Sequence, residues 1–376
     1  LPNPTAANDK YKDLNQRNLL VYTHEREKLS HEVKFSFLTQ QYQYFDDKDS
    51  KKFNFGRTKR YISNYSLTYK IPRLHATITS YSEYELIYGK TDVISEKNRR
   101  QFSQSVLYKQ QLNNALFFDA KIRKDFNTDY SVPLSFALGI KTKKMNNFFL
   151  RANGSKNYSV PTYNDLYWPG QGNINLIPET ALQGEFGIAF KNNNIKVDVA
   201  VFYIDAKNKI VWTPNGDPKR AGIWTPINLR NTRNQGIEFT ADFIKKSGHH
   251  FIKANINYVY TEAKNKRTEK YLIFVPKHLL NSGLAYTYKK YSFFYQQLFT
   301  GKTFTTESNS KDFIIPNFFV ANLGGDYKII KNKAHQVSIG FKVNNIFNEK
   351  YLTQTRRPMP NRNFNLNINN FLIFYK

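Results

Sequence analysis

Apolar and polar side chains alternate with a period of two residues along most of this chain. Near the C-terminus Phe364, Leu366 and Ile368 fall on one face of an extended segment, while Asn365 and Asn367 fall on the other. The same alternation recurs at 33–37, 61–71, 74–86, 132–140, 195–203, 237–243 and 337–343. Because successive side chains of a strand point to opposite faces, the pattern predicts strands with one apolar and one polar face.

The length of these segments distinguishes two all-β folds. The predicted strands run for roughly ten to thirteen residues, whereas globular strands average about five to six and a bilayer crossing needs about nine to eleven. Aromatic residues also gather near the predicted strand ends, as in the girdles of membrane barrels: Tyr42, Tyr44, Phe45, Tyr286, Tyr288 and Tyr375. A soluble sandwich fits the alternation alone. The length favours a transmembrane antiparallel β-barrel.

Long and short connections between the predicted strands alternate. The long ones are expected at 158–180, 207–234, 263–277, 303–316 and 348–361, and the short ones at 192–194, 246–249, 289–290 and 331–334. Bacterial barrels have short periplasmic turns and long outer loops, so the long connections are expected outside.

The pattern predicts about 17 strands, and single-chain bacterial barrels have even strand numbers. We therefore expect further strands before Leu1. Residues 1–15 are expected to be the remnant of an extracellular loop, and residues 16–376 the C-terminal portion of a transmembrane β-barrel domain. The first residues contain no basic segment followed by an apolar run, so no signal peptide is expected in this chain.

Composition excludes several classes of protein. The chain has no apolar run of the roughly eighteen residues that a membrane helix needs. It has no cysteine among 376 residues, which excludes disulfides, thiolate metal sites and cysteine nucleophiles. The net charge is +27, yet the basic residues are spread over the whole chain without a basic helix. Outer-membrane lipid or lipopolysaccharide is therefore the expected anionic partner, and nucleic acid is not.

Candidate chemistry is sparse, and we expect neither an enzyme nor a bound cofactor or metal. The chain contains no G-x-S-x-G, H-E-x-x-H or phosphate-loop motif, and no catalytic residue is assigned. His249 and His250 are adjacent, so their side chains are expected to point apart in a turn rather than bind a metal. Four carboxylates on predicted polar faces are expected to contact water or another domain: Asp198, Asp205, Glu238 and Asp242.

Residues 158–179 read Y-S-V-P-T-Y-N-D-L-Y-W-P-G-Q-G-N-I-N-L-I-P-E. This segment resembles the signature of TonB-dependent outer-membrane transporters, although Ser159 replaces the arginine often found there. The matching residues are Pro161, Asn164, Leu166, Tyr167, Gly172, Asn173, Leu176, Pro178 and Glu179. Residues 343–351, V-N-N-I-F-N-E-K-Y, followed by Pro360, Arg362 and Phe364, resemble the ending of the same family, and 231–239 resemble one of its strand entries.

The resemblance implies a 22-stranded barrel in the outer membrane of a Gram-negative bacterium. In that family an N-terminal plug domain fills the barrel and carries the segment that contacts TonB; this plug is absent from the present chain. The resemblance further implies a small-molecule ligand, with a surface lipoprotein as a further candidate partner. The segment Y-N-D-L-Y-W-P-G-Q-G-N is most similar to the corresponding segment of cobalamin and siderophore receptors. Residues 162–175 contain no histidine, which argues against haem as the ligand.

We therefore expect active, TonB-energised uptake of a scarce large solute such as cobalamin or an iron-siderophore. The alternatives are a passive diffusion porin and an outer-membrane barrel hydrolase. The expected ligand contacts lie in outer loops: Tyr163, Tyr167, Trp168, Trp212, Trp224 and Arg230. Because Trp and Tyr also favour membrane interfaces, these residues could instead pack the loops.

Overall fold

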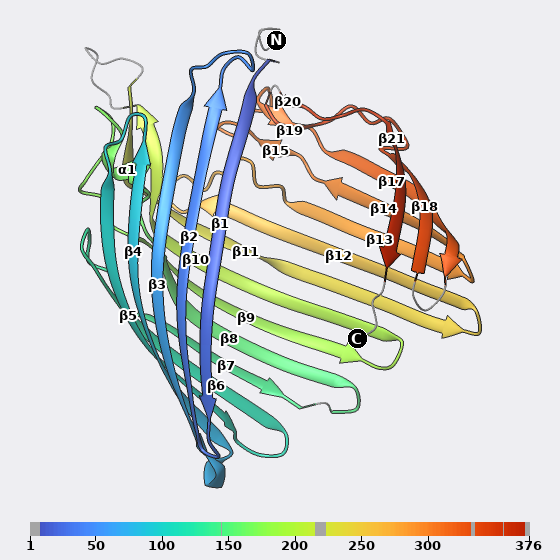
Figure 1. The fold of residues 1–376 in the computed structure, drawn as a ribbon, viewed down its shortest axis with the longest axis horizontal. Coiled ribbons are helices and arrows are strands. Elements are labelled where there is room, and N and C mark those ends of the chain that lie inside the picture. Colours follow the sequence, from blue (N-terminus) through green and yellow to red (C-terminus); the bar gives the residue numbers. More distant parts are fainter. Residues whose placement is uncertain (1–7, 144, 215–222, 332–334, 356, 373–376) are drawn as a thin grey trace. The chain divides into compact units, whose positions relative to one another are not determined.

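The computed structural model describes residues 8–143, 145–214, 223–331, 335–355 and 357–372. Within these residues 17 strands form one sheet, as the alternation predicted (Figure 1). The strands of this sheet are β1 (Lys10–Glu25), β2 (Leu29–Phe45), β3 (Asn54–Ile71), β4 (Ala76–Thr91), β5 (Lys97–Gln111), β6 (Leu116–Asn127), β7 (Ser135–Thr142), β8 (Phe148–Ser159), β9 (Glu179–Lys191), β10 (Ile195–Pro214), β11 (Trp224–Ser247), β12 (His250–Asn265), β13 (His278–Tyr288), β14 (Tyr291–Thr300), β17 (Phe318–Lys331), β18 (His335–Asn344) and β21 (Asn363–Leu372).

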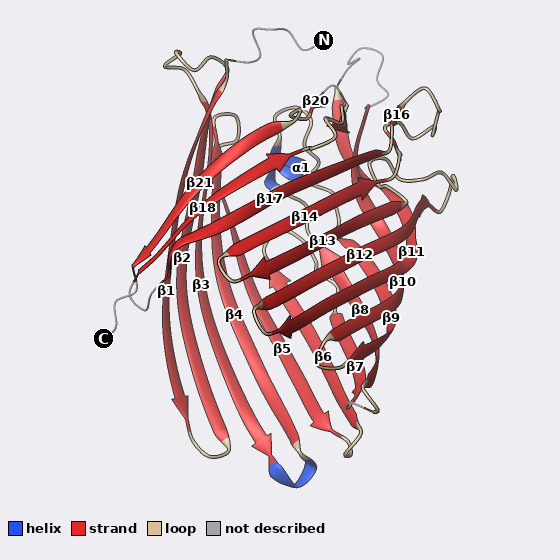
Figure 2. Cartoon of the chain, turned by 90° about the vertical axis from the view of Figure 1, so that its right-hand side faces the viewer, coloured by secondary structure: helices blue, strands red, loops and turns tan. Residues whose placement is uncertain are grey.

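Little other regular structure is present in the described residues (Figure 2). Two small hairpins lie in long connections: β15 (Thr303–Phe304) with β16 (Ile314–Ile315), and β19 (Leu352–Gln354) with β20 (Arg357–Pro358). A 3-10 turn at Pro72–Leu74 links β3 to β4, and the short helix α1 (Tyr163–Tyr167) lies between β8 and β9. No helix in the described part of the chain is both long and apolar enough to span a membrane.

The chain divides into two units. Unit 1 comprises residues 1–143, 151–184 and 204–232, and unit 2 comprises 144–150, 185–203 and 233–376. In unit 1, β1 to β8 pair antiparallel in chain order, and the pairings among β1, β2, β3 and β4 run without a register shift. In unit 2, β12, β13, β14, β17, β18 and β21 also pair antiparallel in sequence.

One face of the unit 1 sheet is apolar and exposed. Phe37 on β2 lies opposite Tyr61 on β3, with ring centroids 4.9 Å apart. Further large side chains on this face are exposed: Phe35, Tyr65, Tyr69, Ile78, Tyr84, Phe102 and Val106. Contiguous exposed apolar surface of this kind marks contact with a membrane or with another protein.

The opposite face of the same sheet is polar and holds a network of charges around the buried Asp125. Asp125 on β6 is 1% exposed and accepts hydrogen bonds from Arg123 Nε (2.8 Å) and the Tyr158 hydroxyl (2.7 Å). Arg123 Nη2 also donates to Ser103 (2.9 Å), and it lies 3.4 Å from Glu83 Oε1. Each buried charge therefore has a partner, as burial of an ion requires.

In unit 2 the C-terminal family motif, residues 343–351, organises the connection between β18 and β21. Asn345 is 2% exposed and has a backbone φ of 51°, in the left-handed region that asparagine tolerates. Its amide side chain donates to the carbonyl of Glu349 (2.8 Å) and accepts from the Glu349 N–H (2.8 Å), while its own N–H donates to Asn322 Oδ1 (3.0 Å). Arg362 is exposed, and its N–H donates to Asn348 Oδ1 (2.9 Å).

Most predicted strand boundaries agree with the structure, but three differ. Residues 10–15, expected to be loop, belong to β1, because they pair with residues 40–45 of β2. The predicted connection at 207–234 is much shorter, since β10 continues to Pro214 and β11 begins at Trp224. The predicted strand at 132–140 begins only at Ser135, and the buried Val132 precedes it.

Candidate functional site: a polar cavity beside the motif helix

The signature segment begins with a capped helix. Thr162 is the N-cap of α1, its hydroxyl accepts from the Asp165 N–H, and the Asp165 carboxylate accepts from the Thr162 N–H (2.9 Å). This reciprocal capping box satisfies the amides that a helix start leaves without partners. Trp168 ends the helix as its C-cap and is 37% exposed.

The glycine-rich part then folds back on the helix. The Gly172 N–H donates to the Trp168 carbonyl (2.8 Å), and the Asn173 N–H donates to the Asp165 carbonyl (2.8 Å). A Cβ atom at residue 172 would lie 2.6 Å from the Leu166 carbonyl oxygen, so only glycine fits. Four apolar residues of the motif are buried beneath this fold: Pro161, Leu166, Leu176 and Pro178.

Three motif side chains fasten the segment to β10 and β11. Trp212 Nε1 donates to Asp165 Oδ1 (2.9 Å), and Asn173 Nδ2 donates to the Pro226 carbonyl (3.0 Å). The Glu179 carboxylate accepts from the Ile210 N–H (2.7 Å). The motif residues therefore have a structural role, since their hydrogen bonds hold this segment against β10 and β11.

A second attachment joins α1 to β4 and β5. The Tyr163 ring packs on Gly89, and its hydroxyl donates to the Ile87 carbonyl (3.4 Å). The guanidinium of Arg99 lies 4.8 Å from the centre of the Tyr163 ring and 5.0 Å from that of Tyr130. These cation–π contacts are worth about 0.5–2 kcal/mol each.

Arg99 links three distant segments. It is 7% exposed, its Nε donates to Asp129 Oδ2 (2.8 Å), and its Nη2 donates to the Pro161 carbonyl (3.4 Å). Burial raises the pKa of Tyr163 to about 12, an effect that the nearby Arg99 charge partly opposes. Burial also raises the pKa of Tyr130, and Arg99 again partly opposes it. Both phenols are therefore neutral at physiological pH.

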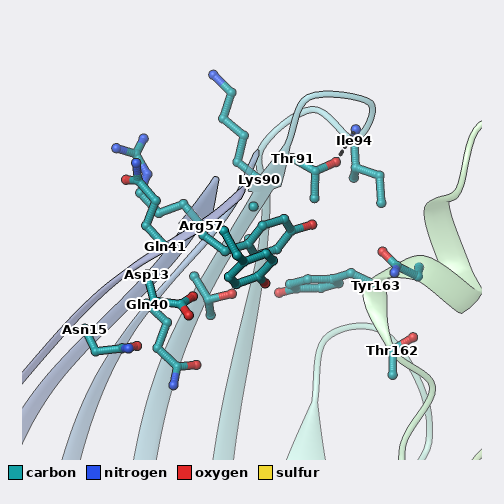
Figure 3. Close-up of a pocket in the computed structure, with 16 residues that line it drawn as sticks. Asp13, Asn15, Gln40, Gln41, Arg57, Lys90, Thr91, Ile94, Thr162 and Tyr163 are labelled. Atoms are coloured by element: carbon teal, nitrogen blue, oxygen red, sulfur yellow. Dashed lines mark hydrogen bonds between the residues drawn. The ribbon is translucent and has the colours of Figure 1, made fainter. Parts of the chain in front are cut away.

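A polar cavity of about 550 Å³ lies in unit 1 between α1 and the ends of β1 to β4 (Figure 3). Tyr11 and Tyr42 form a stacked pair in it, with ring centroids 5.7 Å apart and an interplanar angle of 11°. Tyr163 points from α1 toward the centre of the cavity. The remaining lining residues are Asp13, Asn15, Gln40, Gln41, Gly56, Arg57, Thr58, Gly89, Lys90, Thr91, Ile94, Thr162 and Asn164. The volume falls in the range of about 300–1,000 Å³ typical of ligand pockets.

The structure brings together only some of the predicted ligand contacts. Tyr163 lines the cavity, and the centres of the Tyr163 and Tyr167 rings are 5.9 Å apart. Trp212 contacts α1 through its hydrogen bond to Asp165. Trp212, Trp224 and Arg230 lie on strands rather than in outer loops, because β10 and β11 extend beyond the predicted boundaries. The ligand-binding role of the six residues stays a prediction.

Sequence reasoning missed the β1 and β2 side of the cavity. Tyr11 and Asp13 fell in the segment expected to be a loop, and Tyr42 was assigned to the interfacial girdle. In this segment Tyr11, Asp13 and Asn15 alternate with Lys10, Lys12 and Leu14. In that alternation neither face is apolar, so hydrophobicity does not mark the strand.

No cluster of metal-ligating side chains was found in the described ranges. The carboxylates Asp198, Glu238 and Asp242 lie on β10 and β11, and Asp205 lies further along β10. His249 falls in the turn before β12, and His250 Nδ1 lies 2.8 Å from the Tyr286 hydroxyl.

Comparison with known proteins establishes the family. The family model described as "TonB dependent receptor-like, beta-barrel" matches residues 3–346, so the chain belongs to the TonB-dependent receptor β-barrel family. The vitamin B12 transporter BtuB of Photobacterium profundum is 24% identical over 247 residues, covering 66% of this chain and 39% of that protein. The ferric enterobactin receptor of Pseudomonas aeruginosa is 27% identical over 212 residues, covering 48% of this chain and 26% of that protein.

Solved structures of other receptors have the same fold as this chain. A crystal structure of a ferric enterobactin receptor mutant from Pseudomonas aeruginosa has a TM-score of 0.79 at 17% identity, and covers 96% of this chain and 62% of that chain. The siderophore receptor PirA from Acinetobacter baumannii has a TM-score of 0.78 at 16% identity, with 96% and 63% covered. The present chain thus spans less than half the length of these two curated relatives, and less than two thirds of these two structures.

Proposed function

We propose that this chain is the barrel portion of an outer-membrane receptor that takes up a scarce large solute, such as cobalamin or an iron-siderophore, with energy supplied through TonB. The relatives that it matches are named for vitamin B12 and ferric enterobactin. The exposed apolar face of β2 to β5 supports a position in the outer membrane of a Gram-negative bacterium, against lipid and lipopolysaccharide.

The observation that carries the proposal is the ligand-sized polar cavity beside α1. It lies on the polar face of β1 to β4, opposite the face that exposes Phe35 and Tyr61. The ends of β1 to β4 at the cavity are the ends next to the connections 46–53 and 92–96, away from the Pro72–Leu74 turn. By the rule of short periplasmic turns, this end faces the outside, where a solute arrives.

The proposal includes parts that lie outside these residues. A plug domain would fill the aqueous side of a 22-stranded barrel and contact TonB. The chain from β1 onward would form the C-terminal portion of that barrel domain, and a surface lipoprotein is a further candidate partner. Neither catalysis nor nucleic-acid binding is part of the proposal.

Growth of a receptor-deficient strain that produces the full-length protein tests the function. With cobalamin or a ferric siderophore as the limiting nutrient, growth should be restored at nanomolar solute and should be lost when the same strain lacks TonB. Growth that persists without TonB would identify a passive porin instead. Failure to restore growth on either class of solute would contradict the proposal.

A further inference from the structure

Two rows of paired residues cross the sheet at the cavity. The first row is Asp13, Tyr42, Gly56 and Thr91, and the second is Asn15, Gln40, Thr58 and Gly89. Directly paired residues point to the same face of a sheet, and positions two apart along a strand share that face. All eight residues line the cavity, and Tyr42 and Gly89 contact the Tyr11 and Tyr163 rings that bound it, so both rows face the cavity.

The row between them carries the positive charges and faces the other way. It consists of Leu14, Gln41, Arg57 and Lys90. In Figure 3 the Lys90 ammonium points away from Tyr163 and from the centre of the cavity. Among the lining residues, Asp13 is the one charged residue in the two rows that face the cavity, whereas Arg57 and Lys90 lie in the row between them.

The next row on the cavity face lies outside the cavity lining. It holds Arg17, Arg60 and Arg99, none of which lines the cavity. Arg60 pairs with Glu85 (2.5 Å) and Arg99 pairs with Asp129 (2.8 Å). Asp13, by contrast, forms no ion pair with any residue that the structure describes.

Two glycines allow aromatic rings to pack directly on the strands at the cavity. A Cβ atom at residue 56 would collide with the Tyr42 ring, and one at residue 89 would collide with the Tyr163 ring. The glycines therefore let both rings lie close to the strands. The stacked pair Tyr11–Tyr42 and Tyr163 line the same cavity as the amides of Asn15 and Gln40 and the hydroxyls of Thr58 and Thr91.

We propose that this cavity is a subsite for the flat ring system of an uncharged or cationic solute bearing amide or hydroxyl groups, and that it disfavours polyanionic iron chelates. The inference rests on the proposed function and narrows its substrate class. Tyrosine rings stack on a planar ring, amide side chains both donate and accept hydrogen bonds, and the Asp13 carboxylate repels an anion.

Calorimetric titration of the purified full-length protein tests this inference with two probes. Cyanocobalamin is neutral, amide-rich and built on a nearly flat ring, and ferric enterobactin is a polyanion. Cyanocobalamin should bind at least about tenfold more tightly than ferric enterobactin, a difference of about 1.4 kcal/mol. Tyr42→Leu should weaken cyanocobalamin binding about three- to tenfold by removing a stacked ring.

A charge reversal separates this inference from the proposed function. Asp13→Lys should tighten ferric enterobactin binding at least about threefold. Gln43→Lys, on the opposite face of the strand that carries Tyr42, is the matched control and should change neither affinity by more than about twofold. Circular dichroism would establish that each variant folds.

Ferric enterobactin binding that equals cyanocobalamin binding, and that Asp13→Lys leaves unchanged, would overturn the inference while leaving TonB-energised uptake in place. If neither probe binds and neither supports growth, both proposals fall.

Discussion

Tyr163 fills the space above Gly89 so closely that a Cβ atom at residue 89 would lie 2.5 Å from the Cδ2 and Cε2 atoms of its ring. The two residues come from the β8–β9 connection and from β4, so this contact fixes one wall of the cavity to the sheet. The interaction of Arg99 with the same ring reinforces the attachment.

The first prediction concerns this contact. Gly89→Ala should destabilise the folded protein by about 1–3 kcal/mol, because the added methyl group forces the Tyr163 ring out of place. Gly154→Ala on β8 is the matched control, since its Cβ would meet only the Gln183 carbonyl at 3.7 Å. Urea unfolding in detergent or lipid vesicles measures both. Equal stability of the two variants would show that Tyr163 does not need the glycine.

The second prediction concerns the helix cap. Thr162→Ala removes the N-cap of α1 and should lower the free energy of unfolding of the protein by about 1 kcal/mol. Asp165→Ala should have a larger effect, because the same carboxylate also accepts the Trp212 Nε1 hydrogen bond. In a background where Trp168 and Trp224 are phenylalanine, the fluorescence of Trp212 should shift to the red in Asp165→Ala and remain unchanged in the exposed-loop control Asp46→Ala. An unshifted spectrum in Asp165→Ala would contradict the hydrogen bond.

The third prediction concerns alkaline pH. Burial raises the pKa of Tyr163 to about 12, whereas an unfolded phenol ionises near pH 10. The folded protein therefore favours the neutral ring, and this contribution to stability is complete below about pH 10 and is lost as the pH rises toward 12. The difference in absorbance at 295 nm between wild type and Tyr163→Phe should show one phenol titrating near 12. Titration of that phenol near 10 would place Tyr163 in solvent.

The fourth prediction concerns the charge network on the polar face. Asp125→Ala should destabilise the protein by about 3–5 kcal/mol, because it removes the closest anion of the half-buried Arg123 and the acceptor of the Tyr158 hydroxyl. Asp46→Ala, in an exposed connection, should change stability by less than about 0.5 kcal/mol. Thermal unfolding in lipid measures both values, and a small effect at residue 125 would mean that water replaces the carboxylate.

The fifth prediction concerns the two faces of the sheet. Because the chain has no cysteine, single cysteines can be placed at will. In isolated outer membranes a small, water-soluble thiol reagent should modify Ser36→Cys and leave Phe35→Cys unmodified, since adjacent residues of β2 face opposite sides. Both should react after unfolding in detergent and urea. Modification of Phe35→Cys in intact membranes would contradict a lipid-facing apolar surface.

The sequence predicted the number of strands and the alternation of their faces, because a period of two residues is a local property of the chain. It missed the ends of β10 and β11, where the strands continue through polar residues such as Asn208 and Asn228. There Asn228 Nδ2 donates to the Asn208 carbonyl (2.7 Å), and its Oδ1 accepts from the Ile177 N–H (2.9 Å), so polar contacts hold these ends.

The candidate site could be predicted only in part. The motif pointed to Tyr163, but its partners Arg99 and Gly89 belong to strands far away in sequence, and nothing local to them indicates an aromatic contact. Tyr42 was assigned to the membrane interface because aromatic residues favour it. Its pairing with Asp13 and Gly56 places it on the polar face instead.

The unbroken pairing of β1 to β4 restricts how this protein can diverge. Loss or gain of one residue inside β2 would turn every side chain beyond that point to the opposite face of the sheet. Gln41 would then replace Tyr42 at the cavity, and apolar aromatic side chains would lie on the polar face. Length changes in these strands are therefore tolerable only in twos or at a bulge. Variation in ligand choice is instead expected through point substitutions at positions 11, 13, 15, 40 and 42.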